Sequence, residues 1–278
     1  MTTPAPNEKQ NRAVVEERFT ATAKVFGDYA VTERARLANR LAEMVGAKQT
    51  DTAVDLATGP GTLALPFARR VKWVVAVDLT PAMLERARES ARKDGLANLE
   101  FLRADAQELP IASQSLDLAV TSYSLHHVPD QARMVREMAR VVKPGGRVGM
   151  IDIVVPDTPG ASEAANEIEM ARDNSHTRSL TRKEFAALVD QAGLRTIAVD
   201  FDELGRSFDH WLHVAGWHRG DARYEQTRRL MEATVGSDIA GFHPRYAHAD
   251  SSRPENATQE APDIEMCNNA LFIAAEKI

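Results

Sequence analysis

The sequence predicts a doubly wound α/β protein with a mostly parallel sheet. Two observations carry this prediction. From Ala53 onward, short apolar runs alternate with amphipathic helical stretches, which is typical of parallel strands joined by helical crossovers. In addition, the loop Thr58-Gly59-Pro60-Gly61-Thr62 follows the first apolar run and precedes a helix, so its backbone amides can approach a ligand closely.

Seven runs are predicted to be strands, the last of them antiparallel. They are largely apolar on both faces and bounded by turn residues, as buried strands are. In chain order they are Ala53–Leu56, Trp73–Val77, Leu99–Leu102, Leu116–Val120, Val148–Val155, Thr196–Phe201 and Ala270–Ala275.

The predicted helices between these strands have recognisable ends. Thr80 precedes a helix that Gly95 ends, and Asp130 precedes the next. Thr181 and Glu184 form a capping-box pattern at the start of a third. Strand and helix therefore alternate through the predicted core.

Helical segments are also predicted outside this alternation. After a polar tail, Thr32–Val45 carries the apolar stripe of an amphipathic helix, so residues 1–48 are expected to form a helical N-terminal lid. The core is expected over residues 49–278. Within it, residues 202–265 break the alternation and are too poor in aliphatic residues to build a separate core, which predicts an inserted cap.

Composition limits the possible functions. The chain has 278 residues, 44% of them hydrophobic and 27% charged, as in ordinary globular proteins. Its net charge of −6 offers no basic surplus for a nucleic-acid partner. The longest apolar runs are roughly six residues, so no membrane span is expected. A single cysteine, Cys267, and a polar N-terminus predict a cytoplasmic protein, either a monomer or a homodimer.

Three carboxylates lie at or near the ends of successive strands. Asp55 precedes the glycine loop, where it could hold an ammonium group and would repel a pyrophosphate. Asp78 ends the second strand and can accept from both hydroxyls of a ribose, and Asp105 follows the third. The spacing of Gly59 and Gly61 also fits a dinucleotide fingerprint, so a nicotinamide-dependent oxidoreductase is an alternative.

Five motifs occur in order between about residues 50 and 155. They are Asp55-Leu56-Ala57-Thr58-Gly59-Pro60-Gly61, Val77-Asp78-Leu79-Thr80-Pro81-Ala82-Met83-Leu84, Asp105-Ala106 with Leu109-Pro110, Leu125-His126-His127-Val128-Pro129-Asp130, and Lys143-Pro144-Gly145-Gly146. Together they resemble the class I S-adenosylmethionine-dependent methyltransferases, most of all the ubiquinone and menaquinone biosynthesis subgroup. The resemblance implies a Rossmann-like seven-stranded sheet. It also implies methyl transfer to a small-molecule acceptor without a metal, with carbon or oxygen favoured over nitrogen.

The resemblance further implies how S-adenosyl-L-methionine is held. The expected contacts are Asp55, Ala57, Gly59 and Gly61 for the methionine moiety, Asp78 for the ribose, Leu79 and Met83 beside the adenine, Asp105 and Ala106 for the adenine edge, and Ser122 near the sulfonium. Ala57 departs from the family pattern, which has glycine there, and is expected to be tolerated if its φ is negative. A protein that binds this cofactor without transferring a methyl group is a further alternative.

Five residues are candidates for the acceptor side. His127 and His176 are predicted to be catalytic, as a base or hydrogen-bond donor. His126, Arg178 and Trp211 are predicted to bind substrate, with Arg178 as a clamp for a carboxylate or phosphate. The competing interpretation is structural: packed rings for the histidines and Trp211, and a solvated loop for Arg178.

Overall fold

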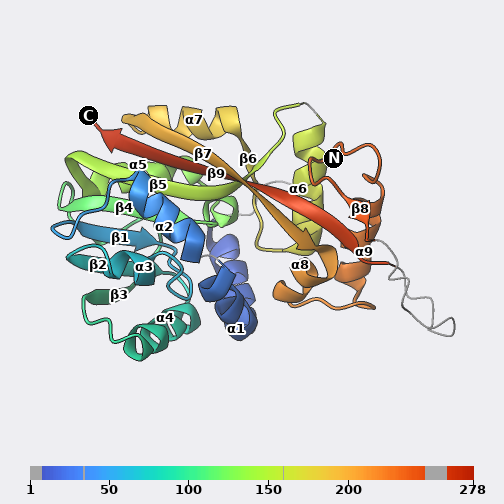
Figure 1. Cartoon of the computed structure of the whole chain (residues 1–278), viewed down its shortest axis with the longest axis horizontal. Helices are drawn as coiled ribbons and strands as arrows, with labels where there is room; N and C mark the ends of the chain where they lie inside the picture. Colours follow the sequence, from blue (N-terminus) through green and yellow to red (C-terminus); the bar gives the residue numbers. More distant parts are fainter. Residues whose placement is uncertain (1–7, 34, 159, 248–261) are drawn as a thin grey trace.

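The computed structural model describes residues 8–33, 35–158, 160–247 and 262–278. Its strands form one twisted sheet in the order β3-β2-β1-β4-β5-β9-β7, with two short strands, β6 and β8, paired to β5 and β9 (Figure 1). Strand β9 runs antiparallel to both of its neighbours, and the pairs from β3 to β5 are parallel. The predicted fold class is therefore confirmed.

The strands have the following bounds: β1 Thr52–Leu56, β2 Trp73–Asp78, β3 Leu99–Arg103, β4 Leu116–Ser122, β5 Val142–Val155, β6 Leu180–Thr181, β7 Leu194–Ser207, β8 Arg245–Tyr246 and β9 Ile264–Lys277. The helices are α1 Glu8–Glu33, α2 Ala35–Met44, α3 Ala64–Ala68, α4 Pro81–Lys93, the 3₁₀ turn η1 Leu125–His127, α5 Gln131–Val141, α6 Ala161–Arg172, α7 Arg182–Gln191, α8 Phe208–Val214 and α9 Ala222–Glu232.

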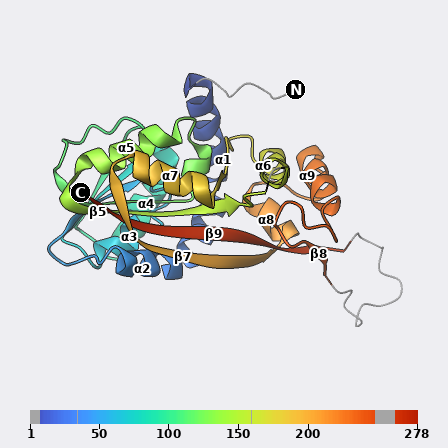
Figure 2. The same ribbon diagram turned by 90° about the horizontal axis from the view of Figure 1, so that it is seen from above.

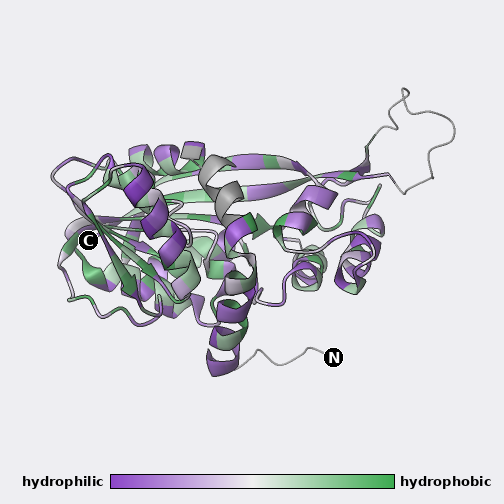
Figure 3. Cartoon of the chain, turned by 90° about the horizontal axis from the view of Figure 1, so that it is seen from below, coloured by the Kyte–Doolittle hydropathy of each residue, from purple (hydrophilic) through white to green (hydrophobic). Residues whose placement is uncertain are grey.

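Two hydrophobic layers enclose the sheet. Helices α5 and α7 cover one face, and α2 and α3 cover the other (Figure 2). The stripe predicted in Thr32–Val45 forms α2, whose Leu37 and Leu41 are buried against the second face. Figure 3 shows the hydrophobic colour concentrated in the strands, while the helices carry hydrophilic stretches. The predicted runs in β1, β2, β4, β5 and β9 are mostly buried, whereas the prediction of buried strands is wrong for β3 and β7, which lie at the edges of the sheet and are largely part-buried or exposed.

Helix α1 agrees with the prediction that residues 1–48 are helical, but it begins at Glu8, within the stretch that was expected to be a polar tail. Its polar side chains Asn11, Arg18 and Thr22 are buried. Because most of the buried residues of α1 are polar, the helix shows little apolar periodicity, and this pattern did not predict where it begins.

Strands β5, β7 and β9 are longer than predicted. Each has 14 residues, and together they extend beyond the region that α2 to α5 cover (Figure 1). A third hydrophobic cluster lies on this extension and joins α6, α8 and α9 through side chains such as Ile168, Trp211 and Met231. Helices α8 and α9, which fall within the predicted cap, thus share a core with α6, which precedes it in the sequence.

Candidate active site

Asp55 accepts hydrogen bonds from the glycine loop and from the start of α3. Its side chain is 1% exposed, and its Oδ2 accepts hydrogen bonds from Thr58 Oγ1 at 2.6 Å and from the amide of Ala64 at 2.8 Å. Burial raises the pKa of this carboxyl to about 7. Its Oδ1 is also buried and has no hydrogen-bond partner among the described residues. Asp55 therefore holds the loop in shape and keeps one oxygen available to a donor.

Asp78 connects this loop to the end of β2. Its Oδ2 accepts from the amide of Gly59 at 2.8 Å, and its Oδ1 accepts from the amide of Thr80 at 2.8 Å. Burial raises the pKa of Asp78, against these amide hydrogen bonds. The carboxylate thereby fixes the two βα loops relative to one another at the carboxyl edge of the sheet.

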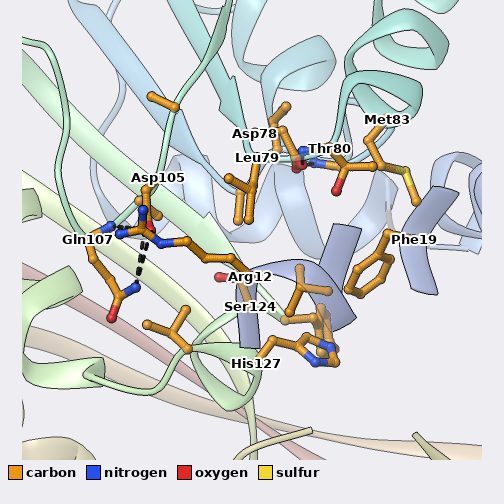
Figure 4. Close-up of a pocket in the computed structure, with 18 of the residues that line it drawn as sticks. Arg12, Phe19, Asp78, Leu79, Thr80, Met83, Asp105, Gln107, Ser124 and His127 are labelled. Atoms are coloured by element: carbon orange, nitrogen blue, oxygen red, sulfur yellow. Dashed lines mark hydrogen bonds and ion pairs between the residues drawn. The ribbon is translucent and has the colours of Figure 1, made fainter. Parts of the chain in front are cut away.

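Helix α1 closes over the same edge. Arg12 Nε lies 2.7 Å from Asp105 Oδ2, and Asp105 Oδ1 accepts from the amide of Gln107 at 2.7 Å (Figure 4). Arg12 and Phe19 of α1 both reach the cavity wall. The N-terminal helix is thus part of the cavity wall.

Asp78, Asp105 and helix α1 line a first cavity of about 820 Å³, a volume that includes its open mouth, whereas Asp55 does not line it. Nine of the predicted site residues lie in its wall: Ala57, Gly59, Asp78, Leu79, Met83, Asp105, Ala106, Ser122 and His127. Gly61 does not line it. At its φ of +92°, a Cβ on Gly61 would lie 2.9 Å from Leu65 Cγ, so this glycine permits close packing of the loop against α3.

Ala57 contradicts the expectation of a negative φ, since its φ is +53°. A left-handed conformation costs an L-residue about 1–2 kcal/mol, whereas glycine adopts it freely. We expect Ala57→Gly to raise the free energy of unfolding by about 0.5–1 kcal/mol, measured by urea denaturation, because glycine's greater freedom in the unfolded chain offsets part of the gain. Ala53→Gly, in strand β1, is the control and should destabilise. A loss of stability in Ala57→Gly would contradict the assigned strain.

A second cavity of about 540 Å³ adjoins the first and shares Phe19, Tyr123 and His127 with it. Two predicted substrate residues, His126 and Trp211, lie in its wall. The remaining lining residues come from α1, β5, α6, the loop after α6, β7 and β9; they are Arg18, Ile153, Glu169, Arg172, Asp173, Arg206 and Asn268.

His127 stands between the two cavities, and a hydrogen-bonded chain fixes its ring. Ser175 Oγ donates to Asp173 Oδ1 at 2.6 Å, and His127 Nδ1 lies 3.0 Å from Ser175 Oγ. Because the hydroxyl proton is committed to Asp173, Ser175 accepts from Nδ1–H, and Nε2 of His127 carries the free lone pair. Burial and the neighbouring His126 lower the pKa of His127 to about 3, so its ring is neutral near pH 7.

Hydrogen-bond partners also hold His126 and His176. His126 Nδ1 lies 2.5 Å from Asp152 Oδ1; burial disfavours the charged ring, but the Asp152 carboxylate outweighs burial and raises the pKa of His126. His176 Nε2 lies 2.9 Å from Asn166 Oδ1, and the ring lines neither cavity. Half-exposed Arg178 pairs with Glu184, also outside both cavities. The structure does not bring His176 and Arg178 to the site.

Two classes of feature are not found in the part of the chain that is described. No three His, Cys, Asp or Glu side chains cluster there as metal ligands. None of the described helices combines the length and apolar character needed to cross a bilayer.

Known proteins resemble this chain in sequence and in structure. Residues 53–146 match a methyltransferase domain family. The 27-O-demethylrifamycin SV methyltransferase of Amycolatopsis mediterranei is 32% identical over 231 residues, which are 82% of this chain and 84% of that protein. The chain belongs to the class I S-adenosylmethionine-dependent methyltransferases. The methyltransferase also superposes on the crystal structure of YcgJ from Bacillus subtilis with a TM-score of 0.77 and 25% identity, over 87% of this chain and 98% of that one.

A third relative of this methyltransferase is a ubiquinone/menaquinone biosynthesis C-methyltransferase from Proteus mirabilis. It is 33% identical over 158 residues, 51% of this chain and 62% of the relative. The cofactor of the family is S-adenosyl-L-methionine, and the first cavity fits it. The ligand is cationic at its sulfonium and ammonium groups. The wall offers Asp78, which forms no ion pair with any described residue, and Asp55 below the loop keeps a buried oxygen without a partner.

Proposed function

We propose that this methyltransferase methylates a hydroxyl oxygen of a small molecule bound in the second cavity, with His127 receiving the hydroxyl proton. The observation that carries the proposal is the position of His127 in the wall of both cavities, with Nε2 as its unprotonated nitrogen. The rifamycin-related protein supports an oxygen acceptor, since its name specifies a 27-O-demethyl compound.

The cofactor, when bound, supplies an electrophilic methyl group, and the chain's own residues position and prepare the acceptor. The first cavity would hold the cofactor through Asp78 and Asp105, with Leu79 and Met83 beside its adenine. Phe19 of helix α1 lies in the wall of both cavities, where it would shield the reacting groups from water. Positioning of this kind reaches effective molarities of about 10⁵–10⁸ M, so it would supply much of the acceleration.

Proton removal is the contribution of His127. The acceptor hydroxyl gives its proton to Nε2, and the imidazolium that forms is bonded through Nδ1–H to Ser175 and from there to Asp173. Asp173 is ionised, because Arg18 outweighs the effect of burial and holds its pKa well below the ordinary range. The chain therefore offers negative charge behind the ring as positive charge develops on it.

We expect His127→Gln to lower kcat about 10-fold. General-base catalysis contributes about 10²–10⁴ when the pKa of the base lies near the working pH, and a pKa of about 3 makes His127 a weaker base. The assay follows S-adenosylhomocysteine release with a panel of small phenols and hydroxy acids. His243→Gln, on an exposed loop, is the matched control. Unreduced kcat in His127→Gln would refute the proposed base, and cofactor binding without any release would favour a non-methylating activity.

The pH dependence gives a separate check. The folded-state pKa of His127 is lowered to about 3, so the ring is the neutral base throughout the range above pH 4. We expect the titration of His127 to cause no inflection in kcat/KM near pH 6.5, so the profiles of the wild type and His127→Gln should have the same shape there. Such an inflection would show that the ring titrates at its ordinary pKa and is not buried as described.

A further inference from the structure

We propose that the acceptor carries a carboxylate, which Arg206 binds in the second cavity. This inference rests on the proposed function, in which that cavity holds the acceptor. It assigns the chemical class of the acceptor and a specificity-determining residue for it.

The charges around the second cavity are paired, with one exception. Arg18 Nη2 lies 3.2 Å from Asp173 Oδ2, and Arg172 Nη1 lies 3.3 Å from Glu169 Oε2. His126 lies against Asp152, as described above. Arg206 forms no hydrogen bond or ion pair with any described residue, and its Nε is buried. The cavity wall therefore holds one uncompensated positive charge.

Asn268 provides a second, independent observation at the same place. Its side chain is 4% exposed; its Nδ2 donates to Glu169 Oε1 at 3.4 Å, while its Oδ1 is buried without a partner among the described residues. Leu204 pairs with Asn268 in the β7–β9 register, and Arg206 is two residues from Leu204. Arg206 and Asn268 therefore lie on the same face of the sheet as diagonal neighbours.

Unpaired buried polar groups are rare in native proteins because each costs about 1–3 kcal/mol, so two of them in one cavity wall indicate a ligand. The guanidinium group has a planar fork of donors that matches a carboxylate, and the Asn268 oxygen requires a donor such as a hydroxyl or N–H. Phe19 and Trp211 add aromatic surface to the same wall. The ligand that satisfies all three features is a small hydroxy or amino carboxylic acid with an apolar body.

The test uses benzoate and benzamide, which have the same shape and differ in charge. Binding of each to the full-length protein, saturated with S-adenosylhomocysteine, is measured by calorimetry or ligand-observed NMR. We expect benzoate to bind at least 10-fold more tightly than benzamide. Arg206→Gln should remove this preference, and Arg206→Lys should restore part of it. Arg195→Gln is the matched control, because Arg195 lies on the same strand but pairs with Glu276.

Equal affinities for benzoate and benzamide, or a preference that survives in Arg206→Gln, would overturn the inference. Unchanged melting temperature and S-adenosylhomocysteine affinity in Arg206→Gln verify that the variant is folded. A separate readout concerns the proposed function: benzoate bound at Arg206 should inhibit methyl transfer competitively with the acceptor. If benzoate binding depends on Arg206 but benzoate does not inhibit methyl transfer, the carboxylate site is supported and the placement of the acceptor in the second cavity is wrong.

Discussion

Asp78→Ala is expected to weaken the binding of S-adenosylmethionine by about 100-fold or more. Asp78 is the wall carboxylate that would accept from the ribose hydroxyls, and hydrogen bonds to a charged group contribute about 1.5–3 kcal/mol each. It also fixes the amides of Gly59 and Thr80, so its removal loosens the two loops that form the cavity. Two such hydrogen bonds amount to roughly 3 kcal/mol, which is about a factor of 100 in Kd.

Calorimetric titration with S-adenosylhomocysteine measures this effect. Asp78→Asn keeps the shape but not the charge, and should lie between the wild type and Asp78→Ala. Asp94→Ala is the control, since Asp94 is an exposed residue after α4 that pairs with Arg69. An affinity in Asp78→Ala equal to that of the wild type would show that the cofactor does not use this carboxylate.

Asp173→Ala is expected to destabilise the protein by about 3–5 kcal/mol, which lowers the melting temperature by roughly 10 °C. The Arg18–Asp173 pair is almost fully buried, with side-chain exposures of 7% and 5%. Removing the carboxylate leaves the guanidinium buried without its counter-charge, and burial already lowers the pKa of Arg18. The same change breaks the hydrogen bond from Ser175, so the orientation of His127 is also lost.

A double-mutant cycle separates these effects. Arg18→Met together with Asp173→Leu removes both charges and should recover much of the stability without recovering kcat. Glu276→Ala, which breaks an exposed pair with Arg195, should cost no more than about 1 kcal/mol. If Asp173→Ala melted at the wild-type temperature, the buried ion pair could not be what holds α1 against the loop after α6.

Asp173 and His127 both make the protein less stable as the pH falls. The pKa of Asp173 is depressed in the folded state, so its contribution is complete above its ordinary pKa near 3.9 and is lost as the pH falls further. The pKa of His127 is also depressed, and the unfolded chain therefore binds the extra proton below pH 6.5. Acidification from pH 7 to pH 5 should thus destabilise the wild type more than His127→Gln.

Eight of the residues predicted to contact the cofactor line the first cavity. Gly59, Asp78 and Asp105 follow or end successive strands, and the carboxyl ends of parallel strands must meet at one edge of the sheet. Chain order and strand spacing are therefore sufficient to bring them together. Ala57 was the exception, because the sign of φ in a tight loop depends on the hydrogen bonds of the loop as a whole.

Two of the five residues predicted for the acceptor side lie outside both cavities. His176 and Arg178 were predicted to contact the substrate. Outside the two cavities, His176 instead pairs with Asn166 and Arg178 with Glu184. No local sequence motif distinguishes Arg206 from the other arginines. Whether a charged side chain is paired or left unpaired depends on contacts between distant segments, and no local spacing records those contacts.

The sequence by itself determined the α/β sheet, its antiparallel strand and the row of groups at its carboxyl edge, because strand periodicity and loop glycines act over a few residues. The tertiary structure alone decided which polar residues of α1 are buried, which histidine lies in the wall of both cavities, and which arginine of the second cavity has no partner among the described residues. These properties depend on desolvation and pairing among segments far apart in the chain, and burial is what gives each of them its energy.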